Sequence, residues 1–562
     1  MRILLALFLA AAAWGAEVKV WEGRLTLPTY EEGPPDVNPP FDVFSPRFLN
    51  YPYAIRDQLT DRKTDRHWRA LFLENEYLKC SVLPDLGGHL YSCTDKINGA
   101  EMFYANPSIK KAKISYRGAW AAFGIEFNFP VSHNWVSLSP VDFAWWRNPD
   151  GGASVMVANV DRPYGMQWRV ELRLNPGSTV LEQRVALYNP GDQPHRYYWW
   201  NNAGVEVWED SRIHYPMRYT AAHGFRSVDT WPVNSAGLDL SVLKNHTAGT
   251  VSQFSHGSRE PFMGVYHPRT KAGVVHWADY ADLPGKKIWS WGWNAAAHEW
   301  ARALSDNQSH YVEVQAGLYR NQETYAFLEP QQTIRFTEYW MPVRDIGGIT
   351  KANLHGVVHL ERQGSTLRAG LNVNHAISQA HLRLRAAGKT VWEAREPLTP
   401  AKTFRREAAC AAPCTFELAN ATGRILLSHT EGKFDFAPDN EIRTGPQPPV
   451  QKESDALEHG ADLELNGRLL AAWDVYKKAL AKDPDHFGLN RAAGRLAVTL
   501  KRYHEAAGLL GRAQRRSSND PEIHYFLGNA YAALGDSRRA REEWEGAQRQ
   551  APFRAAARFA LA

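Results

Sequence analysis

Cysteine is scarce in this chain, with 4 in 562 residues. So few exclude a small fold held together mainly by disulfides. There is no second close cysteine pair and no carboxylate cluster beside the histidines, so we expect no metal and no other cofactor. Beyond the N-terminus no apolar run reaches the roughly 18 residues that a membrane-spanning helix needs. We therefore expect a soluble protein without a membrane partner.

An excess of charge of one sign is also missing. The chain has 65 basic and 60 acidic residues, a net charge of +5. A nucleic-acid-binding protein normally concentrates basic residues on one face. The balance predicts no nucleic-acid partner.

The N-terminal segment has the composition of a secretory leader. Residues 1–16 contain one early basic residue, an apolar run and small residues at the end, MRILLALFLAAAAWGA. The expected location is periplasmic or secreted, where disulfides persist. Cys410 and Cys414 in CAAPC are expected to form a structural disulfide, with free thiols as the alternative, while Cys80 and Cys93 flank a strand-turn-strand pattern.

Tryptophan is abundant, with 21 residues, and aromatic residues make up 12% of the chain. Short alternating segments separated by Gly, Pro and Asn predict a mainly β protein with a large sandwich. We divide the chain into a leader, an irregular proline-rich arm packed on the sandwich, the large sandwich, a small β-sandwich, a linker and a helical tail: 1–16, 17–65, 66–345, 346–440, 441–453 and 454–562. No amphipathic helix is expected within 66–345.

A 34-residue repeat marks the tail. Gly460, Gly494 and Gly528 are 34 residues apart, and a large apolar residue follows each at a fixed distance. This period, with small residues where helices approach closely, is typical of tetratricopeptide repeats. Such a stack predicts a protein partner on its concave surface, or packing against the chain's own β-region.

The large sandwich resembles a known family. The segments LENEYLKCSVLPDLGGHLYSCTDK, GIEFNFPVSH, SPVDF, YYWWNNAGVEV and KKIWSWGW are similar to the family known as domain of unknown function 5107. That family resembles the galactose-mutarotase-like superfamily and frequently carries C-terminal tetratricopeptide repeats. The resemblance implies a β-supersandwich with a sugar site on one concave sheet. It does not imply a particular reaction.

Departures from the mutarotase pattern are informative. The mutarotase base lies in a short Glu-x-Gln segment, which Glu313-Val314-Gln315 matches, so the resemblance implies Glu313 as a base. At the place of the mutarotase acid histidine the chain has Asn201 and Asn202. Related epimerases carry an arginine followed later in the chain by a histidine, and Arg117 and His133 are similar in order.

Three residues are candidates for catalysis. Glu126 should point away from Ile125 and Phe127 by strand alternation, beside Asn128, and Glu313 should share a face with Gln315. Both carboxylates could serve acid-base chemistry, with His133 shuttling a proton. A structural carboxylate, an exposed strand glutamate and a loop histidine are the alternatives.

Other polar and aromatic residues are candidates for sugar binding. Arg117 could bind hydroxyls or form an ion pair with Glu126. Trp291 alternates with Trp289 and Trp293, and the three indoles should form either a stacking platform or an inner core layer. The full set of predicted binding residues is Arg117, Asn128, Asn201, Asn202, Glu206, Trp291 and Gln315.

The sequence supports three functional hypotheses. The first is an exported glycoside hydrolase that uses Glu126 and Glu313 in an aromatic-lined cleft, with an oligosaccharide or glycoside as substrate. The second is an aldose mutarotase or epimerase with Glu313 as base and His133 as acid. The third is a non-catalytic carbohydrate-binding scaffold whose repeats recruit a protein.

Overall fold

The computed structural model of the protein describes residues 17–36, 52–324, 326–437, 456–465 and 468–562. The expected leader (1–16) and linker (441–453) lie outside the described residues. Within these ranges, no helix is both long enough and apolar enough to cross a membrane.

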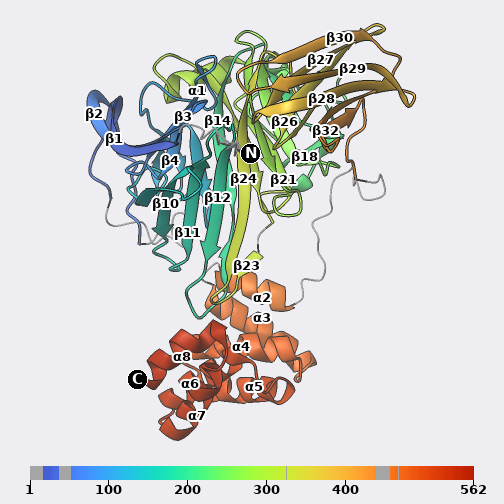
Figure 1. Ribbon diagram of the computed structural model, residues 1–562. Helices are drawn as coiled ribbons and strands as arrows, with labels where there is room; N and C mark the ends of the chain where they lie inside the picture. The colour runs from blue at the N-terminus through green and yellow to red at the C-terminus, as the bar shows by residue number, and fades with distance from the viewer. Residues whose placement is uncertain (1–16, 37–51, 325, 438–455, 466–467) are drawn as a thin grey trace, which may run out of the picture.

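Two packed sheets form the main body of the molecule (Figure 1). In the described part of the chain the larger sheet has twelve strands. Their order is β1 (Lys19–Glu32), β2 (Leu59–Glu74), β3 (Leu78–Leu83), β4 (His89–Asp95), β8 (Ile125–Asn128), β14 (Trp200–Val207), β22 (His310–Gly317), β21 (Gly285–Ser290), β18 (Val251–His256), β16 (Tyr219–Ala221) and β17 (Val228–Thr230), with β5 (Ala100–Glu101) paired to β4.

The second sheet covers one face of the first. Its order is β15 (Arg212–His214), β19 (Phe262–His267), β20 (Ala272–Ala278), β24 (Thr333–Arg344), β12 (Leu181–Tyr188), β11 (Gln167–Leu174), β10 (Ala153–Val160) and β9 (Asp142–Arg147). Two short pairs stand apart from both sheets: β6 (Ala112–Ser115) with β7 (Gly118–Trp120), and β13 (His195–Tyr197) with β23 (Ala326–Leu328).

Aromatic side chains fill the space between the sheets. Phe127 of β8 stacks on Trp199 at 6.3 Å between ring centroids and meets Trp168 of β11 at 6.4 Å. All three rings are buried. Alternation along β8 therefore places Ile125 and Phe127 in the core, as the sequence predicts, and turns Glu126 to the other face.

Two expectations about the sandwich are wrong. The arm expected over 17–65 is not irregular in its described parts, because β1 pairs with β2 over most of its length and both extend the large sheet. The expected boundary at residue 66 falls inside β2. A helix, α1 (Ala295–Leu304), also interrupts the β region; it is short, and Asn294 caps its N-terminus by accepting a hydrogen bond from the Ala297 amide.

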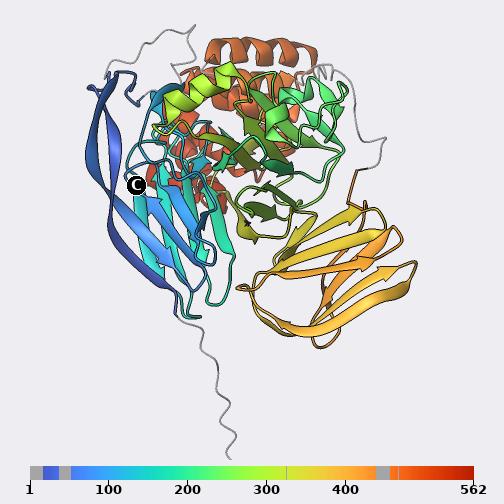
Figure 2. The same ribbon diagram turned by 90° about the horizontal axis from the view of Figure 1, so that it is seen from above.

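A smaller β unit follows the sandwich and stands to one side of it (Figure 2). It has two four-stranded sheets, β25 (Lys351–Asn353), β26 (Gly356–Gln363), β27 (Thr366–Val373) and β30 (Phe404–Ala409), and β29 (Lys389–Leu398), β28 (Ile377–Ala386), β31 (Cys414–Ala419) and β32 (Ile425–Thr430). Cys410 is bonded to Cys414 at one end of this unit, and Cys80 to Cys93 across β3 and β4. The expected Cys410–Cys414 disulfide is therefore present.

The tail is helical, as the repeat predicts. Its helices are α2 (Ala456–Leu465), α3 (Leu469–Lys482), α4 (Phe487–Thr499), α5 (Tyr503–Arg516), α6 (Pro521–Ala533), α7 (Ser537–Ala547) and α8 (Arg554–Leu561). The spaced glycines lie where paired helices touch. A Cβ added to Gly460, Gly494 or Gly528 would stand 2.0, 2.5 or 2.3 Å from Tyr476, Leu510 or Trp544. Close helix approach thus explains the 34-residue period.

We predict opposite effects for two glycine substitutions in this tail. Gly494→Ala should lower the midpoint of thermal unfolding of the helical signal, because overpacking of about 1–3 kcal/mol outweighs the helix propensity that alanine gains. Gly511→Ala is the matched control, since its Cβ meets nothing within 4 Å. It should stabilise the tail by up to about 1 kcal/mol. Thermal unfolding of the two full-length variants, followed by circular dichroism, tests this prediction. Equal shifts of the two unfolding midpoints in the same direction would contradict the close packing assigned to Gly494.

The helical tail also contacts the chain's own β-region. The charge of Asp192, in the loop after β12, adds to the effect of burial in raising the pKa of Tyr525 in α6. Glu329, just after β23, acts electrostatically on Arg495 in α4 and Glu522 in α6. Figure 1 shows β23 directly above α2. One face of the repeat is therefore engaged within the same chain.

Candidate functional site

Four neighbouring strands in the middle of the large sheet, β8, β14, β22 and β21, present polar residues on the face away from the core. Asn202 is the cross-strand neighbour of Glu126, and Gly204 is that of Glu313. On the other side of β22, Trp289 lies opposite Glu313 and Lys287 opposite Gln315. Strand register thus gathers on one face residues that are nearly 190 positions apart in sequence.

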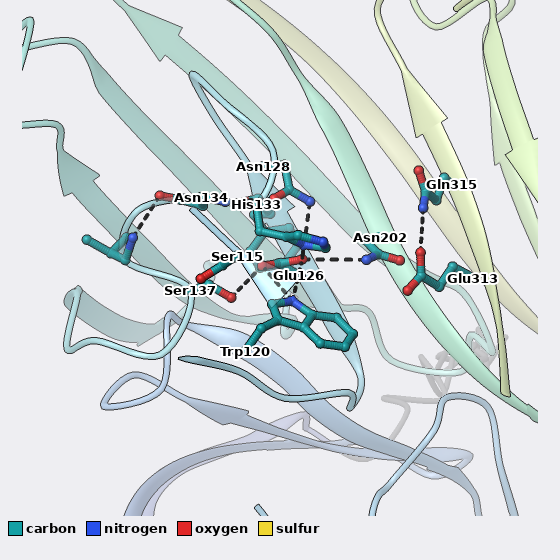
Figure 3. Close-up of polar contacts among 12 residues, drawn as sticks. Ser115, Trp120, Glu126, Asn128, His133, Asn134, Ser137, Asn202, Glu313 and Gln315 are labelled. Atoms are coloured by element: carbon teal, nitrogen blue, oxygen red, sulfur yellow. Dashed lines mark hydrogen bonds and ion pairs between the residues drawn. The ribbon is translucent and has the colours of Figure 1, made fainter. Parts of the chain in front are cut away.

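Glu126 is the centre of a dense group of hydrogen-bond donors (Figure 3). Its Oε2 lies 2.7 Å from His133 Nδ1, and Ser137 Oγ donates to its Oε1. The Trp120 indole N–H lies 3.3 Å from both oxygens. The amides of Asn128 and Asn202 donate to Oε2 at 3.4 and 3.5 Å. These donors occupy the acceptor capacity of an ionised carboxylate.

Electrostatics hold Glu126 and His133 as an ion pair. Burial, with 2% of Glu126 exposed, acts to raise its pKa, but the charge of His133 and the hydrogen bonds from His133 and Ser137 lower the pKa to about 2. For His133, burial acts to lower the pKa, and the charge and hydrogen bond of Glu126 raise it above its ordinary value. The pairing therefore keeps Glu126 a carboxylate and favours the imidazolium form of His133 to a higher pH than for an isolated histidine.

Glu313 has the opposite electrostatic character. It is 6% exposed, and burial raises its pKa, with Glu126 adding to the rise and His133 and Lys287 opposing it. Gln315 Nε2 donates to Glu313 Oε2 at 2.7 Å, and the Tyr311 hydroxyl approaches Oε1 at 3.4 Å. The two carboxyl groups thus have pKa values shifted in opposite directions, which is a common property of acid-base sites.

Asn202 lies between the two carboxyl groups (Figure 3). Its Nδ2 donates to Glu126, whereas its Oδ1 is buried and has no hydrogen-bond partner among the described residues. A buried acceptor without a partner is costly, at about 1–3 kcal/mol. A hydroxyl group of a bound ligand would satisfy it.

Lys287 and Gln322 connect this cluster to a cavity. Lys287 Nζ donates to Gln322 Oε1 at 2.8 Å, and Gln322 Nε2 donates to Gln315 at 3.0 Å and to the Tyr198 hydroxyl at 2.8 Å. Burial lowers the pKa of Lys287 to about 8. A cavity of about 370 Å³ begins at this point, lined among others by Tyr116, Ser132, Trp135, Tyr164, Tyr198 and Gln322. Ser132 is the neighbour of His133, so the cavity borders the loop that carries His133.

The structure brings together most of the predicted site residues. Glu126, Asn128, His133, Asn202, Glu313 and Gln315 all belong to the cluster. Asn128 has a supporting part, since its Oδ1 also accepts a hydrogen bond from the Asn134 amide at 2.9 Å. This bond orients the loop that carries His133.

Arg117 and Asn201 do not belong to the cluster. Arg117 makes no ion pair with Glu126; its guanidinium donates to the carbonyls of Ala54 and Trp135 at 2.8 and 2.7 Å and holds loops together. Asn201 follows the alternation of β14 and points to the face opposite that of Asn202. There it donates to Glu338 of the second sheet and accepts from the Ala316 amide.

Glu206 and Trp291 lie at the margin of the Glu126–Glu313 cluster. Glu206 shares the face of Asn202, but its cross-strand neighbour is Tyr311 and not Glu313. Trp291 stacks on Trp300 of α1 at 4.4 Å and stands 6.5 Å from the Tyr311 ring. The parallel indole platform is also wrong: β21 ends at Ser290, and Trp289 and Trp291 are 83° apart.

Sequence reasoning missed Lys287, Gln322, Tyr198, Trp120 and Ser137. Lys287 alternates with Trp289 on its strand, and Tyr198 directly precedes two core tryptophans. Strand alternation could therefore have identified Lys287, and the position next to the tryptophans could have identified Tyr198. Among the described residues, no group of three or more His, Cys, Asp or Glu side chains is arranged to hold a metal ion.

The fold and the cluster define a two-sheet β-sandwich protein with a buried group of ionisable side chains on its larger sheet. Residues 47–343, more than half of the chain, match the family described as a domain of unknown function, DUF5107, and the protein belongs to this family. Residues 351–429 match the second domain of YphG-like proteins.

A solved structure with a TM-score of 0.54 supports the overall architecture. The chain is similar to a TPR-domain containing protein from Parabacteroides distasonis, at 21% identity and a TM-score of 0.54, over 95% of this chain and 87% of that one. It also matches a galactose mutarotase-like protein from Lactobacillus casei at 11% identity and a TM-score of 0.35, over 49% of this chain and 99% of that one. A putative aldose 1-epimerase from Klebsiella pneumoniae matches at 12% identity and a TM-score of 0.35, over 58% and 92%.

Proposed function

We propose that the protein is a carbohydrate-active enzyme that interconverts the anomers of a sugar, with His133 as the acid and Glu313 as the base. One observation carries the proposal. An imidazolium held by Glu126 lies on the same face as a buried carboxyl group with the opposite pKa shift, and an unsatisfied amide oxygen of Asn202 lies between the two carboxyl groups. The sugar class is supported by the sequence resemblance to mutarotase-like proteins.

The proposed reaction uses His133 as the imidazolium that Glu126 favours and Glu313 as a carboxylate, which its raised pKa makes a stronger base. Glu313 removes the proton from the anomeric hydroxyl, and His133 donates a proton from Nε2, the nitrogen that Glu126 does not engage, to the ring oxygen. The bond between the ring oxygen and the anomeric carbon breaks and gives the open-chain aldehyde. Rotation of the aldehyde and reversal of both proton transfers close the ring as the other anomer.

Glu126 is better suited to orient His133 than to attack a sugar. A nucleophilic or proton-donating carboxyl group must be free towards the substrate, and the lone pairs of Glu126 are taken by five side chains. The lowered pKa also keeps Glu126 ionised. For these reasons we favour anomer exchange over the two-carboxylate hydrolase.

Glycoside hydrolysis is the second candidate, because one observation favours it. The raised pKa of Glu313 suits a general acid that protonates a leaving-group oxygen. In that case His133 would activate water from the opposite side in its neutral form. Hydrolysis should then increase as pH rises through the pKa of His133, whereas anomer exchange should decrease.

Exchange spectroscopy tests the first candidate. The full-length protein is added to a panel of aldoses at anomeric equilibrium, and magnetisation transfer between the α and β signals is measured by NMR. We expect faster exchange than in buffer for at least one aldose. Release of reducing ends from oligosaccharides without faster exchange would support the hydrolase, and ligand-induced shifts without either reaction would support a binding scaffold.

The proposed compartment is the periplasm or the exterior of the cell. This proposal rests on the leader-like residues 1–16 and is supported by two disulfides. We also propose that the repeats bind a protein partner. Its binding surface is the part of the tail that the β-region does not cover.

A further inference from the structure

Three side chains at the rim of the cavity are connected in the order serine, histidine, glutamate. Ser252 Oγ lies 2.9 Å from His223 Nε2, and His223 Nδ1 lies 2.7 Å from Glu323 Oε1. The other carboxylate oxygen of Glu323 accepts the Gly224 amide at 2.7 Å. A nucleophile within hydrogen-bond reach of a base, with the base oriented by a third group, is the arrangement that activates a hydroxyl group.

This triad is separate from the Glu126–Glu313 cluster, and two of its three members line the cavity. His223 and Glu323 line the cavity of about 370 Å³ together with Tyr198 and Gln322. Ser252 on β18 is partly exposed and is the cross-strand neighbour of Trp289, which in turn lies opposite Glu313. The histidine and glutamate of the triad therefore line the cavity, and Ser252 is within hydrogen-bond reach of that histidine.

The orientation of the triad is built into the fold. The His223 ring meets Phe254 of β18 edge to face at 5.1 Å, and Asn321 accepts the backbone amide of Glu323 at 3.0 Å. Burial acts to raise the pKa of Glu323, but the hydrogen bonds from His223 and the Gly224 amide keep the pKa below its ordinary value. Glu323 is thus a carboxylate that fixes which nitrogen of His223 faces Ser252.

Lys287 places a positive charge beside the strand that carries Ser252. Lys287 Nζ stands 5.3 Å from the centroid of the Phe254 ring and 5.4 Å from that of Trp289. Phe254 lies two positions after Ser252 on β18, and Trp289 is the cross-strand neighbour of Ser252. Lys287 also acts electrostatically on Glu323. Its ammonium group can stabilise negative charge on a substrate oxygen at this rim.

The geometry points to a second activity, hydrolysis of short-chain carboxylic esters by Ser252, His223 and Glu323. Ser252 Oγ attacks the ester carbonyl carbon, and His223 Nε2 takes the hydroxyl proton. Collapse of the tetrahedral intermediate breaks the bond to the alcohol oxygen, which takes that proton and leaves. Water then attacks the acyl-serine with His223 as base, releases the carboxylic acid and restores Ser252. The expectation that the alcohol is a sugar rests on the proposed function; the ester chemistry does not.

Serine labelling and ester hydrolysis test the inference on the full-length protein. We expect an alkyl fluorophosphonate to label Ser252, as located by peptide mass mapping. Hydrolysis of p-nitrophenyl acetate should fall at least about 10²-fold in Ser252→Ala and about 10²-fold in His223→Asn. Ser255→Ala is the matched control on the same strand and should retain both labelling and hydrolysis, because Ser255 alternates to the other face of β18.

The outcomes separate this inference from the proposed function. Neither serine labelling nor ester hydrolysis needs a sugar or Glu313. A failure to observe anomer exchange would therefore not contradict the esterase inference. Labelling at another serine, or equal hydrolysis by the wild type and a folded Ser252→Ala variant, overturns it. Unchanged unfolding midpoints for both serine variants show that any loss is chemical.

Discussion

Glu313→Gln should reduce anomer exchange by at least about 10²-fold, the usual contribution of a positioned acid or base. The substitution preserves the shape of the side chain and can still bond with Gln315 and Tyr311, which contact its two oxygens at 2.7 and 3.4 Å. It removes only the ability to accept a proton. Sugar binding and the unfolding midpoint should therefore change little. Exchange NMR for turnover and calorimetric titration for binding make the comparison.

Glu206→Gln is the matched control for this prediction. Glu206 lies on the same face of the neighbouring strand and burial raises its pKa, as for Glu313, but it lies opposite Tyr311 and outside the cluster. Turnover of Glu206→Gln should stay within about threefold of wild type, far less than the change expected at a positioned base. Full activity of a folded Glu313→Gln variant would falsify the assignment of the base.

Glu126→Gln should affect stability and catalysis together. Removing one partner of a buried ion pair costs about 3–5 kcal/mol, and an amide nitrogen cannot accept the hydrogen bonds that Ser137 and Trp120 donate. Without the carboxylate, burial lowers the pKa of His133. His133 then loses its proton at a lower pH, so the acid is missing near neutral pH. Turnover should fall, and its optimum should move to lower pH.

The pH dependence of stability follows from the same pair. The folded-state pKa of Glu126 is lowered from 4.5 to about 2, so its contribution is present above pH 4.5 and is lost as pH falls towards 2. The folded-state pKa of His133 is raised above 6.5, so its contribution is complete below pH 6.5 and is lost as pH rises through the raised value. Wild type should exceed Glu126→Gln in stability most clearly between these limits. Chemical unfolding followed by tryptophan fluorescence at several pH values measures the difference.

Glu260→Gln is the control for Glu126→Gln. Glu260 is also buried and pairs with a cation, Lys351, but at the junction with the second β unit. Its substitution should reduce stability while the pH optimum of turnover stays unchanged. If Glu126→Gln also leaves the optimum in place, Glu126 has a purely structural part and His133 is not the acid.

Local sequence patterns determined much of the fold. Alternation in GIEFNF was sufficient to place Ile125 and Phe127 in the core and Glu126 on the opposite face. The spacing of Gly460, Gly494 and Gly528 was sufficient to predict paired helices in close contact. Both patterns are read within one element or one repeat, where the period of the backbone decides which side chains share a face.

Tertiary structure decided which groups meet. Asn201 and Asn202 are adjacent in sequence, yet one bonds to Glu338 in the core and the other to Glu126. Lys287 joins Glu313 only because β21 pairs with β22, and Ser252, His223 and Glu323 meet from segments 29 and 100 residues apart. Strand order and register are set by burial of the whole aromatic core between the two sheets. No short stretch of sequence contains that information, because the free energy that fixes the register is distributed over all the strands.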